Sequence, residues 1–378
     1  MTEKSHVSTY HPFIQRQADA QPMSLSYLAQ DWPNASEWAA AGRAKMAELL
    51  AYDPQPCPPN AQVLESVQRP GFVRHLIRFN VTADRTTDAY LLVPDGLNGP
   101  APTIMALHDH GGFYYYGKEK SCQTENIAPI MWEFANRSYG GQFFGDELAR
   151  QGFVVFVPDA FYFGSQRLSV DHLALDFADE LNGLTPDTDE YVAKFNALAN
   201  QHETLVAKTL FTSGTTWPGV LFQGDRAALD YLVTRPEVDQ ERIGCAGLSI
   251  GGFRSAHLFG LDPRIKAGVV AGWMTTYGSL LFDHLRYHTW MIYVPRQLQW
   301  LDLPDVATLN APRPLMVINC IKDALFTMDG MQAAEKKIAE VYERMDAAEN
   351  FHCRYDDEPH SLKPPAQDAA IQWLKKHL

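Results

Sequence analysis

Residues 242–253 constrain the fold more than any other part of this 378-residue chain. A short apolar run ends in Gly247-x-Ser249-x-Gly251 and leads into residues 253–259, which have a helical composition. A serine on a sharp turn between a strand and a helix has a strained backbone, so the residues two before and two after it must lack a Cβ atom. The pattern therefore predicts a strand, a tight turn that exposes Ser249, and a helix. The alternative is a glycine-rich turn with an incidental serine.

The charge and composition narrow the kinds of partner that we expect. A net charge of −13 and an isoelectric point near 5.4 argue against nucleic acid and anionic membrane surfaces. No apolar run has membrane-spanning length, and the first six residues do not begin a secretory signal, so we expect a cytoplasmic protein. We expect buried thiols in place of a disulfide framework, because the five cysteines are odd in number and widely scattered: Cys57, Cys122, Cys245, Cys320 and Cys353.

The first 60 residues are expected to form a helical extension. Ser36 is placed to cap a helix over residues 37–52, with an apolar stripe that would cover a sheet face or a neighbouring subunit. Strand patterns begin near Val63, and residues 73–79 and 88–94 are typical of an antiparallel hairpin at a sheet edge.

Strands and helices alternate through the rest of the chain. This order predicts an α/β domain over residues 61–378, with a mostly parallel sheet and helices on both faces. We expect insertions at about 160–217 and 273–312, the second rich in aromatic residues. Besides the strand before Ser249, strands are expected at 102–107, 153–158, 267–271, 315–320 and 351–355, and helices at 145–151, 219–234, 330–345 and 364–376.

An acid and a histidine follow two of the later strands. Ligands of parallel sheets bind at the carboxyl ends of the strands, and Asp323 and His360 lie just past the strands at 315–320 and 351–355. In the order Ser249, Asp323, His360, the imidazole would take the serine proton and the carboxylate would orient the ring. Other acids compete with Asp323 for this role: Asp329 and, beside the histidine, Asp356, Asp357 and Glu358.

The segment His108-Asp109-His110-Gly111-Gly112 follows the strand at 102–107. A loop in this position is expected to supply one N–H group of an oxyanion hole, from His110 or, as the second choice, Gly111; the other comes from Ile250. The alternative is a metal held by the two histidines. However, residues i and i+2 at a strand end point in opposite directions and no third ligand is evident, so we expect neither metal nor cofactor.

Aromatic residues near these motifs are candidates for a substrate pocket. They are Phe113 and Tyr114 after the oxyanion loop, and Trp273 and Tyr277 in the second insertion. The alternative is that these rings only pack a helical lid against the body of the protein or another subunit. We expect the nearby run Lys118-Glu119-Lys120 to be a solvated charge cluster.

The chain resembles the α/β-hydrolase superfamily from about residue 60 onward, and within it the dienelactone hydrolase and acetyl xylan esterase-like branch. The motifs that carry this resemblance are residues 107–113 and 247–252, Asp323, and Pro359-His360. Dienelactone hydrolases have a cysteine nucleophile where this chain has Ser249, which favours esterase chemistry.

The resemblance implies a serine carboxylic-ester hydrolase that forms an acyl-enzyme with small or oligomeric esters, carrying acetyl or other short acyl groups on aryl or sugar alcohols. The alternatives are a C–C bond hydrolase or lactonase, and a non-catalytic ligand-binding protein on the same scaffold. A small-molecule ester is the expected partner, and a homo-oligomer is left open.

Overall fold

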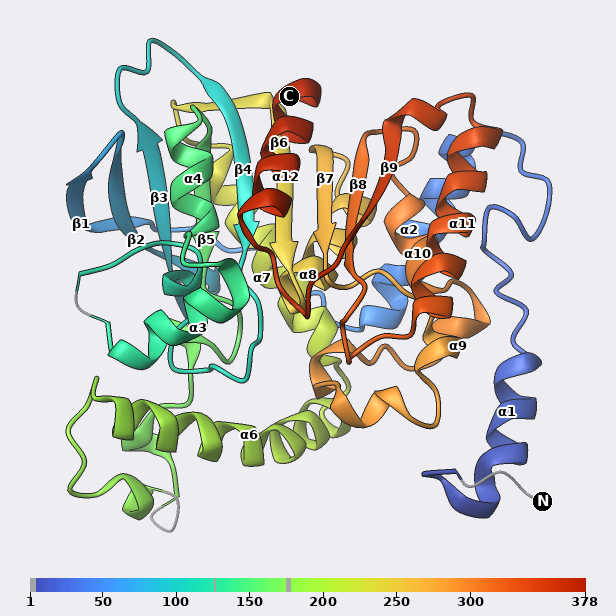
Figure 1. The fold of residues 1–378 in the computed structure, drawn as a ribbon, viewed down its shortest axis with the longest axis horizontal. Coiled ribbons are helices and arrows are strands. Elements are labelled where there is room, and N and C mark those ends of the chain that lie inside the picture. The colour runs from blue at the N-terminus through green and yellow to red at the C-terminus, as the bar shows by residue number, and fades with distance from the viewer. Residues whose placement is uncertain (1–4, 126, 175–177) are drawn as a thin grey trace.

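The computed structural model describes residues 5–125, 127–174 and 178–378, which contain a nine-stranded sheet (Figure 1). The strand order is β1-β2-β3-β5-β4-β6-β7-β8-β9. Strands β1, β2 and β3 are antiparallel, β3 is antiparallel to β5, and the pairs from β5 to β9 are parallel. The strands are β1 Gln62–Arg69, β2 Phe72–Thr82, β3 Arg85–Pro94, β4 Ala101–Leu107, β5 Val154–Pro158, β6 Val238–Leu248, β7 Ile265–Ala271, β8 Leu315–Cys320 and β9 Phe351–Asp356.

The predicted mostly parallel sheet is confirmed, with one correction at its antiparallel end. The hairpin β2–β3 is present, but it does not form the edge, because β1 pairs with β2 on the outside. Most side chains of β1 are exposed on both faces, so the strand has no alternation of buried and exposed residues that a sequence pattern could reveal.

The register of the parallel strands brings the loops that follow them together. Leu107 at the end of β4 pairs with Gly247 of β6, and Leu248 pairs with Ala271 at the end of β7. The carboxyl ends of three neighbouring strands therefore lie at the same level, and the residues that follow them share one edge of the sheet.

Helices cover both faces of the sheet, as predicted. Helices α4 and α12 lie in front of it, and α7 and α8 lie behind it (Figure 1). The helices are α1 His11–Asp19, α2 Ala35–Leu50, α3 Pro129–Tyr139, α4 Phe144–Arg150, α6 Asp189–Thr212, α7 Trp217–Leu232, α8 Ile250–Leu261, α9 Tyr277–Leu280, α10 Leu303–Thr308, α11 Met328–Arg344 and α12 Pro364–His377.

Two insertions lie beyond the carboxyl ends of the strands. One contains α6, a helix of 24 residues that runs below the sheet in Figure 1. The other follows β7 and contains α9 and short 3₁₀ turns at His284–Tyr287, Trp290–Ile292 and Gln297–Gln299. Both segments lie on the side of the residues that follow the strands and are placed to form walls around them.

The N-terminal segment contains α1 and α2 before β1 begins. The side chain of Asn34, and not that of Ser36, caps α2 by accepting from the N–H of Glu37 at 2.9 Å, because the helix begins at Ala35. The apolar stripe of α2 is buried as expected, and the helix packs against α7 and α8, the helices behind the sheet.

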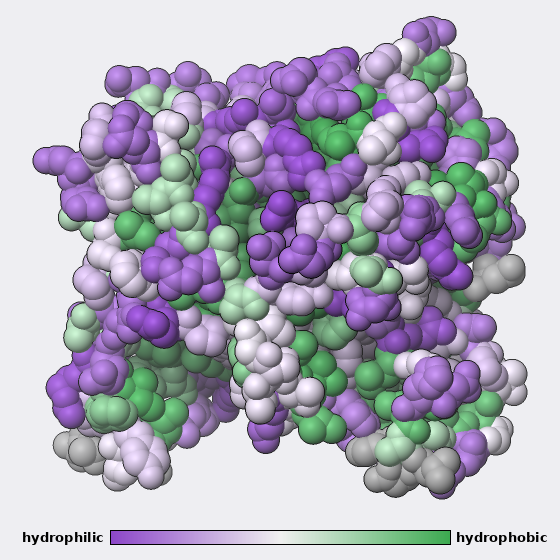
Figure 2. All heavy atoms as spheres, turned by 180° about the vertical axis from the view of Figure 1, so that it is seen from behind, coloured by the Kyte–Doolittle hydropathy of each residue, from purple (hydrophilic) through white to green (hydrophobic). Residues whose placement is uncertain are grey.

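The outer surface is largely polar. Figure 2 shows hydrophilic residues over most of the rear face, with hydrophobic residues in scattered groups. No helix in the described parts of the chain is long and apolar enough to cross a membrane. All five cysteines are free, and Cys122, Cys245 and Cys320 are buried.

A buried ion pair joins the two helices behind the sheet. Arg254 of α8 donates to Asp225 of α7 through Nε at 3.0 Å and Nη2 at 2.5 Å, and the two side chains are only 1% and 3% exposed. Burial raises the pKa of Asp225, although Arg254 opposes this shift. The carboxylate thus depends on the arginine for its charge.

We expect Arg254→Met to lower the free energy of unfolding by about 3–5 kcal/mol, because it leaves a carboxylate buried without its partner. Urea denaturation would measure this. The control is Arg344→Met, which removes an arginine 49% exposed and paired with Glu340; it should change stability by less than about 1 kcal/mol. Equal effects of the two substitutions would contradict the prediction.

Candidate active site

Ser249 lies in a strained turn between β6 and α8. Its φ is 59° and its ψ is −123°, outside the regions that non-glycine residues usually occupy. A Cβ atom on Gly247 would lie 2.5 Å from the carbonyl oxygen of Leu107, and one on Gly251 would lie 2.0 Å from the same oxygen. Both glycines are therefore required by contact with the end of β4, as the sequence pattern predicted.

The structure brings His360 and Asp323 into direct contact. Nδ1 of His360 and Oδ2 of Asp323 are 2.5 Å apart, and the Asp323 side chain is 1% exposed. The backbone N–H of Leu325 donates to Oδ1 of Asp323 at 2.9 Å. The carboxylate is thereby fixed from two sides and holds the imidazole in one orientation.

The competing acids have other positions or partners. Asp356 accepts from Arg354, Asp357 from Lys322 and Glu358 from Lys363. Asp329 lies in the first turn of α11. Of the acids that the sequence offers, Asp323 is the one hydrogen-bonded to His360.

Ser249 and His360 face one cleft without a hydrogen bond between them. Nε2 of His360 is buried and has no hydrogen-bond partner within the described residues. The contact between nucleophile and base is commonly long in a site without substrate and tightens in the complex. Nε2 is therefore free to accept a proton from a group that enters the cleft.

This cleft has a volume of about 590 Å³. Residues from both insertions and from α3 form its walls. The residues that line it are Asp109, His110, Gly111, Gly112, Arg137, Ser138, Asn200, Leu248, Ser249, Ile250, Trp273, Tyr287, His288, Thr289, Leu325, Pro359 and His360.

The loop after β4 lines the cleft together with Ser249. Gly112 uses its N–H to donate to Nδ1 of His110 at 2.9 Å. The N–H groups of His110 and Gly111 donate no hydrogen bond within the described residues, and Ile250 is the first residue of α8, where helical N–H groups lack intrahelical partners. The three residues predicted for the oxyanion hole are thus all in the cleft wall.

A carboxylate from α6 holds this loop, and sequence reasoning missed it. Nδ1 of His110 accepts the N–H of Gly112, so Nε2 is the ring nitrogen that donates, to Oε1 of Glu203 at 2.9 Å. The same oxygen accepts from Tyr114 and Thr289, each at 2.8 Å. Burial would raise the pKa of Glu203, but these hydrogen bonds, chiefly the one from His110, lower it overall.

Each histidine of the loop has both ring nitrogens occupied by protein groups. Nδ1 of His108 lies 2.9 Å from its neighbour's carbonyl oxygen, and Nε2 accepts from the N–H of Ala160. Burial, with help from Lys120, holds the pKa of His108 well below its usual range. The described parts of the chain contain no cluster of three or more side chains suited to a metal ion.

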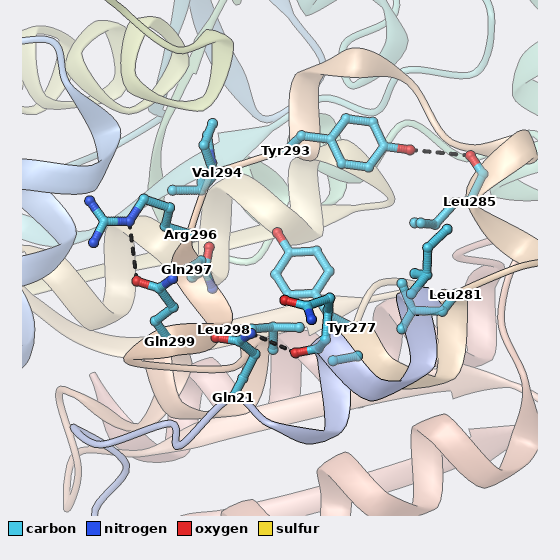
Figure 3. A pocket seen from close by; sticks show the side chains of 14 residues that line it. Gln21, Tyr277, Leu281, Leu285, Tyr293, Val294, Arg296, Gln297, Leu298 and Gln299 are labelled. Atoms are coloured by element: carbon cyan, nitrogen blue, oxygen red, sulfur yellow. Dashed lines mark hydrogen bonds between the residues drawn. The ribbon is translucent and has the colours of Figure 1, made fainter. Parts of the chain in front are cut away.

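Of the four aromatic residues predicted to bind substrate, the structure places Trp273 in the cleft and the other three outside it. Phe113 stacks on Tyr116, and the hydroxyl of Tyr114 donates to Glu203 behind the loop. Tyr277 lines a separate pocket of about 400 Å³ between α1 and the second insertion, shown in Figure 3. For these three rings the alternative interpretation holds, because they pack within the protein and do not line the cleft.

The expectation of a solvated cluster at Lys118-Glu119-Lys120 is wrong. The side chain of Lys118 is 7% exposed, and Lys120 is fully buried. Lys118 pairs with Asp159, which follows β5, and Lys120 contacts carbonyl oxygens 10 and 11 residues earlier in its own loop, which three adjacent charged letters in a sequence cannot reveal.

The order of strands, the turn at Ser249 and the Asp323–His360 pair together define an α/β-hydrolase. The dienelactone hydrolase family matches residues 141–370, which is more than half of the chain and includes all three of these residues. The chain therefore belongs to the dienelactone hydrolase family, and the protein is a hydrolase.

Comparisons over the whole chain agree with this assignment. The "Putative hydrolase YtaP" of Bacillus subtilis (strain 168) is 23% identical over 340 residues, which cover 90% of this chain and 99% of that protein. The structure of "a putative acetyl xylan esterase" from Bacteroides fragilis NCTC 9343 matches with a TM-score of 0.71 at 16% identity, covering 92% of this chain and 82% of that chain. A glucuronoyl esterase from Solibacter usitatus matches with a TM-score of 0.62 at 13% identity, covering 95% and 97%. These structural matches show a shared fold.

We expect Asp323→Asn to lower kcat by roughly 10³- to 10⁴-fold, because an amide in this position no longer favours the tautomer of His360 that can accept a proton. Steady-state hydrolysis of a nitrophenyl ester would measure the loss. Asp357→Asn is the matched control, since it neutralises a nearby acid whose side chain is 74% exposed, and it should retain full activity. Similar losses in the two variants would argue against the role of Asp323.

Proposed function

We propose that this protein is a serine carboxylic-ester hydrolase that acts through an acyl-enzyme. The observation that carries the proposal is the position of Ser249. It lies on a strained turn in the same cleft as the unoccupied Nε2 of His360 and the unpaired N–H groups of the loop after β4. A nucleophile, a base and donors for an oxyanion are the three parts that acyl transfer requires.

The first half of the proposed reaction forms the acyl-enzyme. Oγ of Ser249 attacks the ester carbonyl while its proton passes to Nε2 of His360, and Asp323 stabilises the resulting imidazolium. The negative charge that develops on the carbonyl oxygen is held by the N–H of Ile250 and that of His110 or Gly111. His360 then protonates the leaving alcohol, and the acyl group remains on Ser249.

The second half of the reaction releases the acid. Water enters the cleft, loses a proton to His360 and attacks the acyl carbon, and the collapse of the second tetrahedral intermediate returns the proton to Ser249. The N–H of Ile250 is available in both halves, because it lies at the N-terminus of α8, where the helix dipole also favours negative charge.

The proposed substrates are small or oligomeric esters of a sugar with a short acyl group, and the lining of the cleft supports this choice. The aromatic residues of the cleft wall are Trp273 and the half-exposed Tyr287, and its hydrogen-bonding groups include those of Arg137, Asn200 and Thr289. Aromatic rings that stack on sugars combined with polar groups that bind hydroxyls suit a polyhydroxylated substrate. The similar proteins described as acetyl xylan esterase and glucuronoyl esterase agree with this choice.

The proposed acyl-enzyme predicts a burst of nitrophenol when the protein is mixed with nitrophenyl acetate. The burst should equal the enzyme concentration and be absent in Ser249→Ala, because the first product leaves before the acyl group is hydrolysed. Stopped-flow absorbance would measure it. Full activity of Ser249→Ala would overturn the proposal. Turnover of a lactone without turnover of open-chain esters would favour a lactonase, and turnover of a β-diketone alone would favour a C–C bond hydrolase.

The proposed sugar site predicts that Asn200→Ala raises KM for an acetylated monosaccharide by about 3- to 10-fold, the effect of losing one neutral hydrogen bond. KM for nitrophenyl acetate should stay within about twofold, because that substrate has no hydroxyl to bind. Steady-state kinetics on both substrates test this. Equal changes for the two substrates would show that Asn200 supports the cleft wall and does not bind a sugar.

A further inference from the structure

The fully buried side chain of Lys120 lies directly behind the loop that faces Ser249. Its Nζ donates to the carbonyl oxygen of Asp109 at 2.8 Å and to that of His110 at 2.9 Å. The rings of Phe163 and Phe134 lie near the ammonium, with centroids 4.5 and 5.9 Å away. Burying an ammonium group among aromatic rings costs free energy, and the two hydrogen bonds to the loop are the direct contacts that offset this cost.

The two carbonyl groups belong to the peptide units that carry the candidate oxyanion donors. The carbonyl of Asp109 shares its peptide with the N–H of His110, and the carbonyl of His110 shares its peptide with the N–H of Gly111. A trans peptide holds its N–H on the side opposite its carbonyl oxygen. Because both oxygens point at Nζ, both N–H groups point away from it, and both residues line the cleft.

We propose that Lys120 is a positioning residue for the oxyanion hole, whose ammonium fixes and polarises the two peptide groups that face the substrate carbonyl. This inference rests on the proposed acyl transfer. A cation on a carbonyl oxygen draws electrons from the peptide and makes its N–H a stronger donor, as in other hydrogen-bond chains. The positive charge also favours negative charge on the far side of these two peptide groups, because the buried surroundings of Lys120 screen it weakly. No proton leaves Lys120 in this role.

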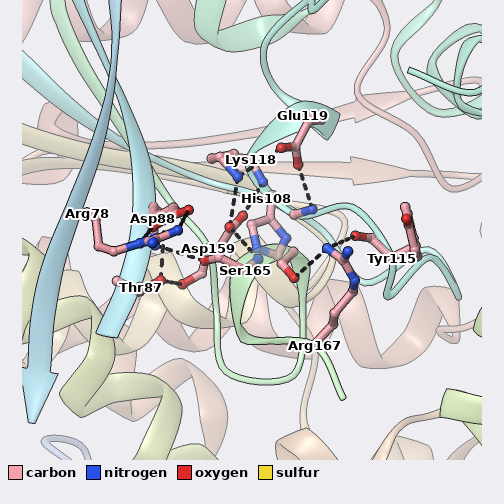
Figure 4. Close-up of polar contacts among 12 residues, drawn as sticks. Arg78, Thr87, Asp88, His108, Tyr115, Lys118, Glu119, Asp159, Ser165 and Arg167 are labelled. Carbon is pink, nitrogen blue, oxygen red and sulfur yellow. Dashed lines mark hydrogen bonds and ion pairs between the residues drawn. The ribbon is translucent and has the colours of Figure 1, made fainter. Parts of the chain in front are cut away.

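The neighbouring lysine of the same turn has a different partner, which makes it a matched control. Nζ of Lys118 contacts Asp159 at 3.0 Å and Glu119 at 2.8 Å (Figure 4). It makes no hydrogen bond to the loop at 108–112 within the described residues. Lys118 is thus also buried, but its Nζ contacts carboxylates, whereas that of Lys120 contacts the carbonyl oxygens of the loop.

The surroundings of Lys120 also give the proposed role a pH dependence. Burial lowers the pKa of Lys120 to about 8, against the attraction of nearby carboxylates. The ammonium is therefore present below about pH 8 and is lost above it, so the support to the oxyanion hole falls as the pH rises. The charged and titratable groups that face Lys120 are Asp109 in the loop, Asp159 after β5, Glu119 and Lys118 in its own turn, Arg254 of α8 and His108.

The experiment compares Lys120→Met with Lys118→Met in the hydrolysis of nitrophenyl acetate at pH 7. We expect kcat of Lys120→Met to fall by about 10- to 100-fold, somewhat less than the roughly 10²- to 10³-fold loss that follows removal of a direct oxyanion donor. KM should change by less than about twofold, because the substrate carbonyl is bound strongly only in the transition state. Lys118→Met should keep kcat within about threefold.

The pH profile separates this role from a purely structural one. In the wild-type protein kcat should decline above about pH 8, and in Lys120→Met this alkaline decline should be absent. An unchanged kcat in Lys120→Met, an equal loss in Lys118→Met, or the same alkaline decline in both Lys120→Met and the wild type would overturn the inference. Circular dichroism and thermal unfolding at each pH show that the compared proteins are folded.

A second measurement uses only the wild-type protein, in case Lys120→Met does not fold. A trifluoromethyl ketone of acetyl size forms a tetrahedral adduct with a serine nucleophile, and its affinity should fall by about fivefold or more between pH 7 and 9.5. A constant affinity over this range would overturn the inference. The nitrophenol burst tests the acyl-enzyme separately: a burst with unaltered kcat in Lys120→Met rejects the role of Lys120 alone, whereas the absence of a burst rejects the proposed function.

Discussion

The contact between the turn at Ser249 and the end of β4 is the constraint on which the site depends. The carbonyl oxygen of Leu107 lies where a Cβ atom on Gly247 or Gly251 would be. This approach is closer than any side chain allows, and it sets the distance between the nucleophile and the loop that begins at His108. The strained φ of Ser249, worth about 1–3 kcal/mol, persists because β6, α8 and β4 are all fixed by the sheet register.

Two buried cations lie behind this contact, Arg254 and Lys120. Arg254 pairs with Asp225 and also reaches the carbonyl oxygen of His108 at 3.4 Å, while Lys120 contacts the next two carbonyl oxygens of the loop. Three successive carbonyl groups thus point toward cations. Since every carbonyl that points inward leaves its N–H pointing the other way, the buried cations determine which face of the loop meets the cleft.

The sequence was sufficient for features that local patterns determine. The glycines around Ser249 and the apolar strands follow from residues close together in the chain. Asp323 and His360 were found because each comes just after a predicted strand, and the structure brings these two into contact. It was insufficient where burial depends on distant segments. Lys120 is indistinguishable from a surface lysine until Phe134, Phe163 and the loop carbonyls surround it.

Glu203 illustrates the same limit at greater range. It lies 93 residues from His110, on the amphipathic helix α6, and no motif in that helix marks it. The sequence also could not show which aromatic residue lines the cleft. Phe113, Tyr114 and Trp273 are all large aromatic residues near the motifs, and only the packing places Trp273 in the cleft. Asn and Ser are both common helix caps, so the sequence could not show that Asn34, and not Ser36, caps α2.

The two insertions do more than form the walls of the cleft. Oε1 of Glu203 accepts hydrogen bonds from His110 in the oxyanion loop and from Thr289 in the second insertion, so one oxygen atom joins α6, the loop and the wall. The same helix contributes Asn200 to the cleft. Any substrate group that displaces Thr289 from Glu203 would therefore change the hydrogen bonding of His110. For the proposed esterase, this means that substrate binding at the wall and the geometry of the loop at 108–112 are linked through a single carboxylate, without any change to Ser249, Asp323 or His360.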